Sequence, residues 1–305
     1  MKILSLDDQY KKHLSRYDLR YYPQYGKLLL EVSSFEFESD IEIHEIVNTL
    51  KEKNIHHLSI NTYLNNYQLN LENLKYLSFL TGLGIGRGSY VNIEYLYHLK
   101  HLKYLFIYND NYGEKIDFSK LPHLERLEII CSLKNIVGVN NLKNLKALKL
   151  QKYNEKDLSY LSNLNELETL ELIQPKIETL NGIEKFQKLK CFTLFNANKL
   201  MSLENINHLR SLEYIVFSDC KRISGYEKLK ELKNLIYISF VKCGSITTLI
   251  WLKNLEKLEF MGLVETNVLD GDISLLVNIP KHGYTNKRNF NYYQDKNNND
   301  IKKFM

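Results

Sequence analysis

Apolar residues recur along most of this chain in one phrase, with leucines at its first, fourth, seventh and ninth positions. Two clear copies run from Leu142 to Leu150 and from Leu164 to Leu172. The phrase returns about every 22 residues between residues 55 and 260, and a fixed period of this length is the sequence signature of stacked repeats. Aligned on the fourth position, it predicts about ten coils, marked by Leu74, Leu102, Leu124, Leu145, Leu167, Leu189, Leu212, Leu235 and Leu255 after a degenerate copy at residues 55–60.

Each copy of the phrase predicts one short strand. The alternation across Leu148, Lys149 and Leu150 is the period-two pattern of a strand whose leucines both turn inward. Successive strands would pair in parallel, and the flanking leucines would fill the interior of the coil. No coil buries its apolar side alone, so stability must come from its neighbours. A coil of about 22 residues is too short for a full helix, and we expect 3-10 or extended backbone on the outer side.

One spacing in this series, between Leu74 and Leu102, is longer than the others and contains the glycine-rich residues 81–90. The glycines from Gly82 to Gly88 lack the GxGxxG or GxxxxGK spacing of a phosphate-binding loop and open no strand–helix–strand unit. We therefore expect a flexible insertion here, with the strand of this coil placed before it at residues 76–80.

The ends of the chain predict caps on the stack. Ser39 and Glu42 form the capping-box pattern that begins helices, and apolar residues follow at helical spacing. We expect a helix over residues 40–52, preceded by a strand over residues 26–32. The predicted organisation is an N-terminal cap of strand plus helix over residues 1–54, the repeats over residues 55–262, and a C-terminal cap with a basic, Asn- and Lys-rich tail over residues 263–305.

The repeated phrases resemble the leucine-rich repeats of about 22 residues per coil found in bacterial internalins and in similar phosphatase-regulatory proteins. The resemblance covers about two thirds of the chain. It implies an α/β leucine-rich repeat solenoid with a parallel concave sheet, a short 3-10 or extended convex side and a cap at each end. One feature departs from the pattern. Three residues after the last strand leucine, where the family usually places Asn or Cys, only Cys220 and Cys243 match.

Several features predict a cytoplasmic, bacterial member of that class. The chain has no run of eighteen or more apolar residues that could cross a membrane. It becomes charged after six residues, whereas a secretory signal needs about 7–15 apolar ones, and it lacks the sorting motif of wall-anchored internalins. The four cysteines form no CxxC pair, which favours reduced, packed thiols over disulfides.

The net charge is concentrated at the C-terminal end. Residues 281–305 hold six basic and two acidic residues, which gives +4 of the formal +5. A nucleic-acid binder would carry its basic residues on the folded body. We therefore predict a protein partner, with no nucleic-acid partner and no membrane association.

The strand residues between the leucines point onto the concave sheet face, which is rich in aromatic and apolar side chains. Tyrosine offers a large contact area at a low entropy cost, and exposed apolar patches mark interaction sites. The alternative is that such residues simply favour strands and pack across neighbouring ones. The predicted partner-binding residues are Tyr76, Leu80, Tyr104, Phe106, Tyr108, Ile173, Phe195, Tyr214, Val216, Tyr237 and Val241.

Charges alternate in the middle of this face, at Glu128, Lys149 and Glu171. They predict cross-strand ion pairs worth ~0.2–1 kcal/mol each, or a charged mark that selects the partner. His98 and His101 have a spacing seen in metal sites but no Cys or carboxylate beside them. No nucleophile–base arrangement emerges either, so we predict no catalytic, cofactor-binding or metal-binding residues.

These observations predict a non-enzymatic, monomeric protein-interaction module that binds its partner on the concave face. An immunity-type inhibitor that occludes a toxin is the specific role that we favour. A recognition or regulatory subunit of an enzyme complex and a translocated effector are the alternatives. Cys191 lies on the predicted face, where a packed cysteine is more common than a reactive one.

Overall fold

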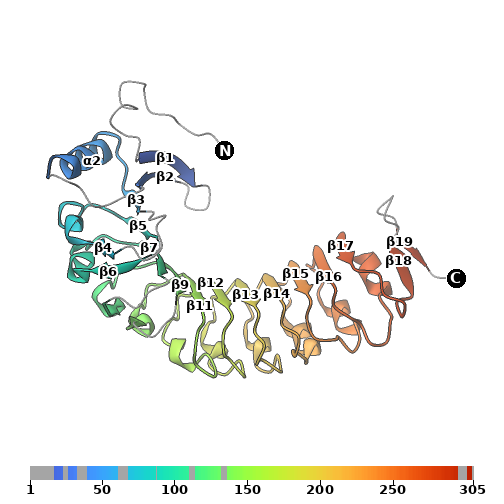
Figure 1. Cartoon of the computed structure of the whole chain (residues 1–305). Helices are drawn as coiled ribbons and strands as arrows, with labels where there is room; N and C mark the ends of the chain where they lie inside the picture. The colour runs from blue at the N-terminus through green and yellow to red at the C-terminus, as the bar shows by residue number, and fades with distance from the viewer. Residues whose placement is uncertain are drawn as a thin grey trace. The chain divides into compact units, whose positions relative to one another are not determined.

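The computed structural model describes residues 17–22, 27–32, 40–60, 68–86, 88–109, 114–131, 136–294 and 301–303. The chain divides into two compact parts, residues 1–145 and residues 146–305. Coils with one inner strand and an outer turn make up most of each part (Figure 1). Of the helices in the described part of the chain, none combines the length and apolar character that a membrane crossing requires.

The first part begins with an antiparallel hairpin of β1 (Tyr17–Tyr22) and β2 (Lys27–Val32). Helix α2 (Asp40–Glu52) follows, as predicted, whereas Ser39 of the capping box lies outside the described residues. From β2 onward neighbouring strands are parallel. Each of these later strands is the last segment of one coil. These strands are β3 (His57–Ile60), β5 (Gly82–Ile85), β7 (Tyr104–Asn109) and β9 (Arg126–Cys131).

The outer side of the first part consists of 3-10 helices and short parallel bridges. The helices are η2 (Glu72–Tyr76), η3 (Ile93–His98), η4 (Phe118–Lys120) and η6 (Val139–Asn141). The bridges join β4 (Gln68–Asn70) to β6 (Ser89–Val91) and β8 (Ile116–Asp117) to β10 (Ile136–Val137).

The second part is a parallel sheet that continues past residue 262. Its strands are β11 (Ala147–Gln151), β12 (Thr169–Ile173), β13 (Cys191–Phe195), β14 (Tyr214–Ser218), β15 (Tyr237–Val241), β16 (Phe260–Val264) and β17 (Lys281–Tyr284). The outer 3-10 helices are η7 (Ser159–Leu161), η8 (Ile183–Lys185), η9 (Ile206–His208), η10 (Tyr226–Glu231), η11 (Ile250–Asn254) and η12 (Ser274–Asn278). The antiparallel pair β18 (Tyr292–Gln294) and β19 (Ile301–Lys303) follows.

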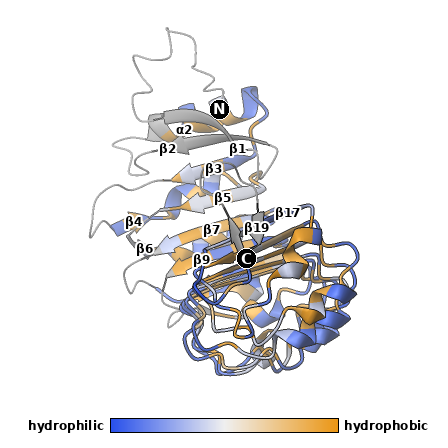
Figure 2. Ribbon diagram, turned by 90° about the vertical axis from the view of Figure 1, so that its right-hand side faces the viewer, coloured by the Kyte–Doolittle hydropathy of each residue, from blue (hydrophilic) through white to orange (hydrophobic). Residues whose placement is uncertain are grey.

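The leucines of each phrase form the core of the coils. Leu164, Leu167, Leu170 and Leu172 all have no exposed surface, and each buried leucine stabilises the fold by about 1.5–3 kcal/mol. The outer turns are mostly hydrophilic, while apolar residues concentrate in the strands (Figure 2). The predicted leucine-rich repeat solenoid, with a parallel sheet and a short 3-10 outer side, is confirmed.

Each strand from β11 to β16 is followed by a residue with left-handed backbone, which turns the chain sharply outward. Lys152 has φ +57° and Lys242 has φ +52°, a conformation that costs a non-glycine residue about 1–2 kcal/mol. The turn is held from the next coil: Lys152 N–H donates to the Ile173 carbonyl at 2.7 Å, and Lys242 N–H donates to the Val264 carbonyl at 2.8 Å. The same turn recurs at Gln174, Asn196, Asp219 and Glu265.

Two cysteines and a threonine form a short ladder at the position where the family usually places Asn or Cys. The Cys243 thiol lies 3.3 Å from the Phe217 carbonyl of the preceding coil. Thr266 Oγ1 donates to the Phe240 carbonyl at 3.1 Å and accepts from Cys243 N–H at 3.1 Å. The same contact, at 3.8 Å, joins the Cys220 thiol to the Leu194 carbonyl.

Glycine-rich residues 82–85 form a strand, so the flexible insertion predicted there is wrong. Gly82 to Ile85 is β5, which pairs with β3 and β7. Leu83 and Ile85 point inward and are almost fully buried. The phrase of this coil therefore starts at Leu77, and Leu80 occupies its fourth position, 22 residues before Leu102. Leucines occur at every third position from residue 71 to residue 83. A phrase that starts at Leu71 therefore matches the leucine pattern as well as the one that starts at Leu77.

The phrase marked by Leu255 predicts a strand over residues 257–261, and the observed strand is displaced from it by three residues. In β16, Met261 and Leu263 lie opposite the inward residues Ile238 and Phe240 of β15, and both are fully buried. Phe260 instead lies on the opposite side of the sheet from the core. The cause is the same, because Leu252, Leu255 and Leu258 are also spaced by three residues.

Candidate binding face

The open face of the sheet consists of the strand residues that point away from the coil interior, and it corresponds to the predicted concave face. In the second part these residues form three columns, since parallel pairing places equivalent positions side by side. The register aligns Cys191 with Tyr214, Tyr214 with Tyr237, and Tyr237 with Phe260. The side chains of one column are therefore neighbours about 4.8 Å apart in the sheet.

The first column holds a row of three aromatic rings. The ring centroids of Tyr214 and Tyr237 are 6.2 Å apart. Those of Tyr237 and Phe260 are 4.4 Å apart, with the ring planes only 7° from parallel. Such pairs contribute about 0.5–1.5 kcal/mol beyond their burial, so the rings hold one another in place before any partner arrives. Tyr214 at the end of the row is 40% exposed.

Strands β13 to β16 carry no charged residue on their open face. We call this area the uncharged patch. Its outer column is apolar apart from one serine, and Val264 in it is 42% exposed. Depletion of charge is what distinguishes the centre of a protein interface from ordinary surface. The patch consists of Cys191, Thr193, Phe195, Tyr214, Val216, Ser218, Tyr237, Ser239, Val241, Phe260, Gly262 and Val264.

An ion pair borders the uncharged patch. Lys149 Nζ lies 2.8 Å from Glu171 Oε1, with the two side chains 27% and 25% exposed, so the predicted cross-strand pair between these two residues is confirmed. Glu128 belongs to the first part, where Arg126 Nη1 lies 3.5 Å from its carboxylate. Ile173 stands on the same strand as Glu171 and extends the apolar column of the patch.

The open face of the first part has an aromatic strip that is one strand wide. Tyr104, Phe106 and Tyr108 lie on β7, and the His57 ring is 5.4 Å from that of Tyr104. Gly82 is required beside them, because a Cβ there would lie 2.7 Å from His57 Nδ1. The open-face positions of β5 and β9 that lie next to the strip are mostly glycine or charged residues, so the strip does not widen onto these strands.

Two predicted site residues do not lie on the sheet face. Tyr76 is in η2, and its ring is 5.3 Å from that of His44 in α2. Leu80 has no exposed surface. Their predicted placement is wrong because the strand of their coil is β5. The predicted strand near residue 260 was three residues too early, so Phe260, Gly262 and Val264 were not predicted on the open face. The phrase Leu255-x-x-Leu258-x-x-Met261-x-Leu263 would have identified them.

Cys191 is the nucleophile candidate on the open face. Burial raises the pKa of its thiol, and the neighbouring Glu171 carboxylate raises that pKa further. A reactive cysteine needs a lowered pKa, so the surroundings of this thiol do not activate it as a nucleophile. Over the described residues, no three His, Cys, Asp or Glu side chains lie close enough together to hold a metal ion.

No protein-family model matches the sequence, and no curated protein matches it either. The fold has clear counterparts among solved structures, and these define the class as leucine-rich repeat solenoids. Within that class the chain is similar to an internalin, InlF of Listeria monocytogenes, with a TM-score of 0.53 and 17% identity over 83% of this chain and 92% of that one.

Receptor ectodomains share the same fold. The leucine-rich repeat ectodomain of the Arabidopsis receptor kinase HAESA, solved in complex with an IDA peptide hormone, has a TM-score of 0.55 and 23% identity over 76% of this chain and 41% of that one. A TDR receptor has a TM-score of 0.51 and 19% identity over 79% of this chain and 44% of that one. At these identities the likeness establishes the internalin-like leucine-rich repeat fold.

Proposed function

We propose that this protein is a non-catalytic interaction module that binds another protein on the uncharged patch of β13 to β16. The observation that carries the proposal is the run of twelve neighbouring open-face positions without a charge, built around an ordered aromatic row. A surface of this kind is typical of an interface centre. The solved HAESA ectodomain holds a peptide hormone, which supports a protein or peptide as the class of ligand.

The stacking of the rings favours a protein partner. Tyr237 and Phe260 cover each other's faces, so the row presents ring edges and the tyrosine hydroxyl groups to the partner. Edges and hydroxyls suit aliphatic side chains and backbone groups of a protein surface. Because the sheet and its neighbours already fix these rings, little conformational entropy is lost on binding.

Within this class we favour an immunity-type inhibitor that acts in the bacterial cytoplasm and covers a toxin. Two features support this role: a preformed surface suited to tight, permanent occlusion, and free thiols at Cys191, Cys220 and Cys243, which suit a reducing compartment. A regulatory subunit of an enzyme complex would use the same patch but would remain bound to its enzyme at all times.

The test is affinity capture from the native cell lysate with four forms of the protein. Two carry Tyr237→Ser or Val264→Ser in the patch, and a matched control carries Tyr160→Ser, at a tyrosine that is 42% exposed on the outer helix η7. Loss of an interface hot spot costs about 2 kcal/mol, or roughly 30-fold in affinity. We expect a protein held by the wild type and the control but lost by both patch variants. Equal recovery by all four, with unchanged melting curves, would refute the proposed site.

A further inference from the structure

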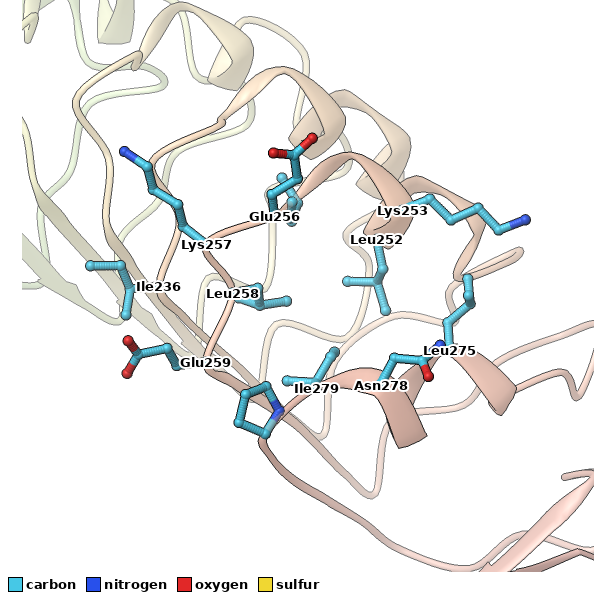
Figure 3. A pocket seen from close by; sticks show the side chains of 12 residues that line it. Ile236, Leu252, Lys253, Glu256, Lys257, Leu258, Glu259, Leu275, Asn278 and Ile279 are labelled. Carbon is cyan, nitrogen blue, oxygen red and sulfur yellow. The ribbon is translucent and has the colours of Figure 1, made fainter.

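A cavity of about 650 Å³ opens at the step between β16 and β17, in the second part (Figure 3). Its walls come from the three successive coils that end in β15, β16 and β17, and Figure 3 shows Leu258 and Ile279 facing the same space. The aliphatic and proline lining is Ile236, Leu252, Leu255, Leu258, Leu275, Ile279 and Pro280.

One inter-coil hydrogen bond is missing at the step where the cavity lies. At each strand from β12 to β16, the residue before the strand and the first strand residue both donate to one carbonyl of the preceding coil. Glu259 N–H and Phe260 N–H, for example, donate to the Ile236 carbonyl at 2.9 and 3.1 Å. At the last step only Lys281 N–H donates, to the Glu259 carbonyl at 2.9 Å, since Pro280 has no N–H to offer.

The core leucines next to the cavity are more exposed than their equivalents in the preceding coil. Leu229, Leu232 and Leu235 of the preceding coil have no exposed surface. Their equivalents one coil later, Leu252, Leu255 and Leu258, are 7%, 5% and 6% exposed. Apolar core atoms of this coil are thus open to a ligand.

The rim of the cavity indicates what enters it. Lys253 and Lys257 are balanced by Glu256 and Glu259, and Lys257 Nζ already donates to Asn234 Oδ1 at 2.7 Å. A rim with no net charge above an aliphatic floor selects an uncharged apolar group. The cavity also adjoins the uncharged patch, because its lining residues Ile236 and Glu259 directly precede Tyr237 and Phe260 in the chain.

We infer that this cavity receives one large uncharged side chain, of the leucine, methionine or phenylalanine type, from the protein that covers the uncharged patch. The inference rests on the proposed function, because the side chain is carried across the rim by the partner already seated on the patch. An anchor buried in a pocket at the margin of a flat aromatic contact would fix the position of the partner along the sheet.

The test uses methyl NMR of the full chain with two small probes, N-acetyl-phenylalaninamide and N-acetyl-leucinamide, at millimolar concentration. We expect selective shifts of the Leu252, Leu258 and Ile279 methyl groups. N-acetyl-lysinamide should give no such shifts. Octanoate distinguishes a lipid from a side chain: selective shifts with octanoate in the absence of shifts with the two apolar amides would overturn the inference.

Two matched variants link the cavity to the partner. Leu275→Trp fills the cavity from its partly exposed wall, whereas Asn254→Trp places the same ring at an exposed residue of the preceding outer helix that does not line the cavity. We expect the first variant to abolish the probe shifts and weaken capture of the partner at least tenfold, and the second to change neither. If Leu275→Trp captures the partner normally while Tyr237→Ser does not, the cavity role fails and the proposed function stands.

Discussion

Substitutions at Gly182 and Gly225 distinguish two contributions to stability: the close contact between coils and the strain of the left-handed backbone. Both precede an outer 3-10 helix, and both have left-handed φ angles, of +91° and +83°. Alanine in that conformation costs about 1–2 kcal/mol. The two positions differ in what lies beside them, so substituting alanine at each isolates the second effect.

A side chain at Gly182 would collide with the preceding coil. An ideal Cβ there lies 2.6 Å from Ser159 N and 2.7 Å from the Leu158 carbonyl carbon. Both are backbone atoms, so no side-chain rotation relieves the contact and the coils must separate. The hydrogen bond from Leu158 N–H to the Asn181 carbonyl, 2.8 Å long, would stretch or break. At Gly225 the nearest atom is 3.5 Å away, which is an ordinary contact.

The free energies of unfolding should therefore differ. Gly225→Ala should cost about 1–2 kcal/mol from the backbone alone. Gly182→Ala adds about 1–3 kcal/mol for overpacking and about 0.5–1.5 kcal/mol for the lost hydrogen bond, which with the backbone cost gives roughly 2.5–6.5 kcal/mol in total. Urea unfolding, monitored by circular dichroism, measures the free energy of unfolding of both variants. The dependence of that free energy on urea concentration should be the same for the two. Equal losses, within about 0.5 kcal/mol, would show that close contact between these coils does not stabilise the stack.

Two further substitutions test the core and the ladder. Leu170→Asp places a charge where the side chain has no exposed surface, so we expect at least about 3–5 kcal/mol of destabilisation in a thermal melt, and an unchanged melting temperature would refute the inward placement of Leu170. Thr266→Val removes the partner of the Phe240 carbonyl and of Cys243 N–H, which should cost about 1–3 kcal/mol. Thr247→Val, at an exposed position, is the control and should stay within about 0.5 kcal/mol of the wild type.

The sequence predicted the solenoid because the phrase is physically constrained. From Leu164 to Leu172 only one frame places every leucine in the interior, and the strand formed where the alternation predicted it. Helix α2 was predictable for the same reason, since its buried residues Ile43, Ile46, Val47 and Leu50 recur at helical spacing.

The candidate site was less predictable, because a face assignment depends on the register. A shift of three residues reverses which side of the strand faces the core, and leucines spaced by three leave the frame ambiguous. The cavity had no local signal at all. Its walls meet only in the three-dimensional stack, at a step where Pro280 offers no N–H and His282 replaces the usual leucine.

The two frames for the strand near residue 260 make opposite predictions for two adjacent residues. In the structure, Met261 is fully buried opposite Ile238, so Met261→Ala should cost about 2–5 kcal/mol. Phe260 lies on the open face and stacks on Tyr237, so Phe260→Ala should cost about 0.5–1.5 kcal/mol for the stacking plus part of the ring's burial. In the frame read from the sequence, Phe260 would be inward, and its loss would cost about 3–5 kcal/mol while that of Met261 would be small. Chemical unfolding of the two alanine variants decides between them: a larger loss for Phe260→Ala than for Met261→Ala would remove Phe260 from the patch and break the aromatic row on which the proposed site depends.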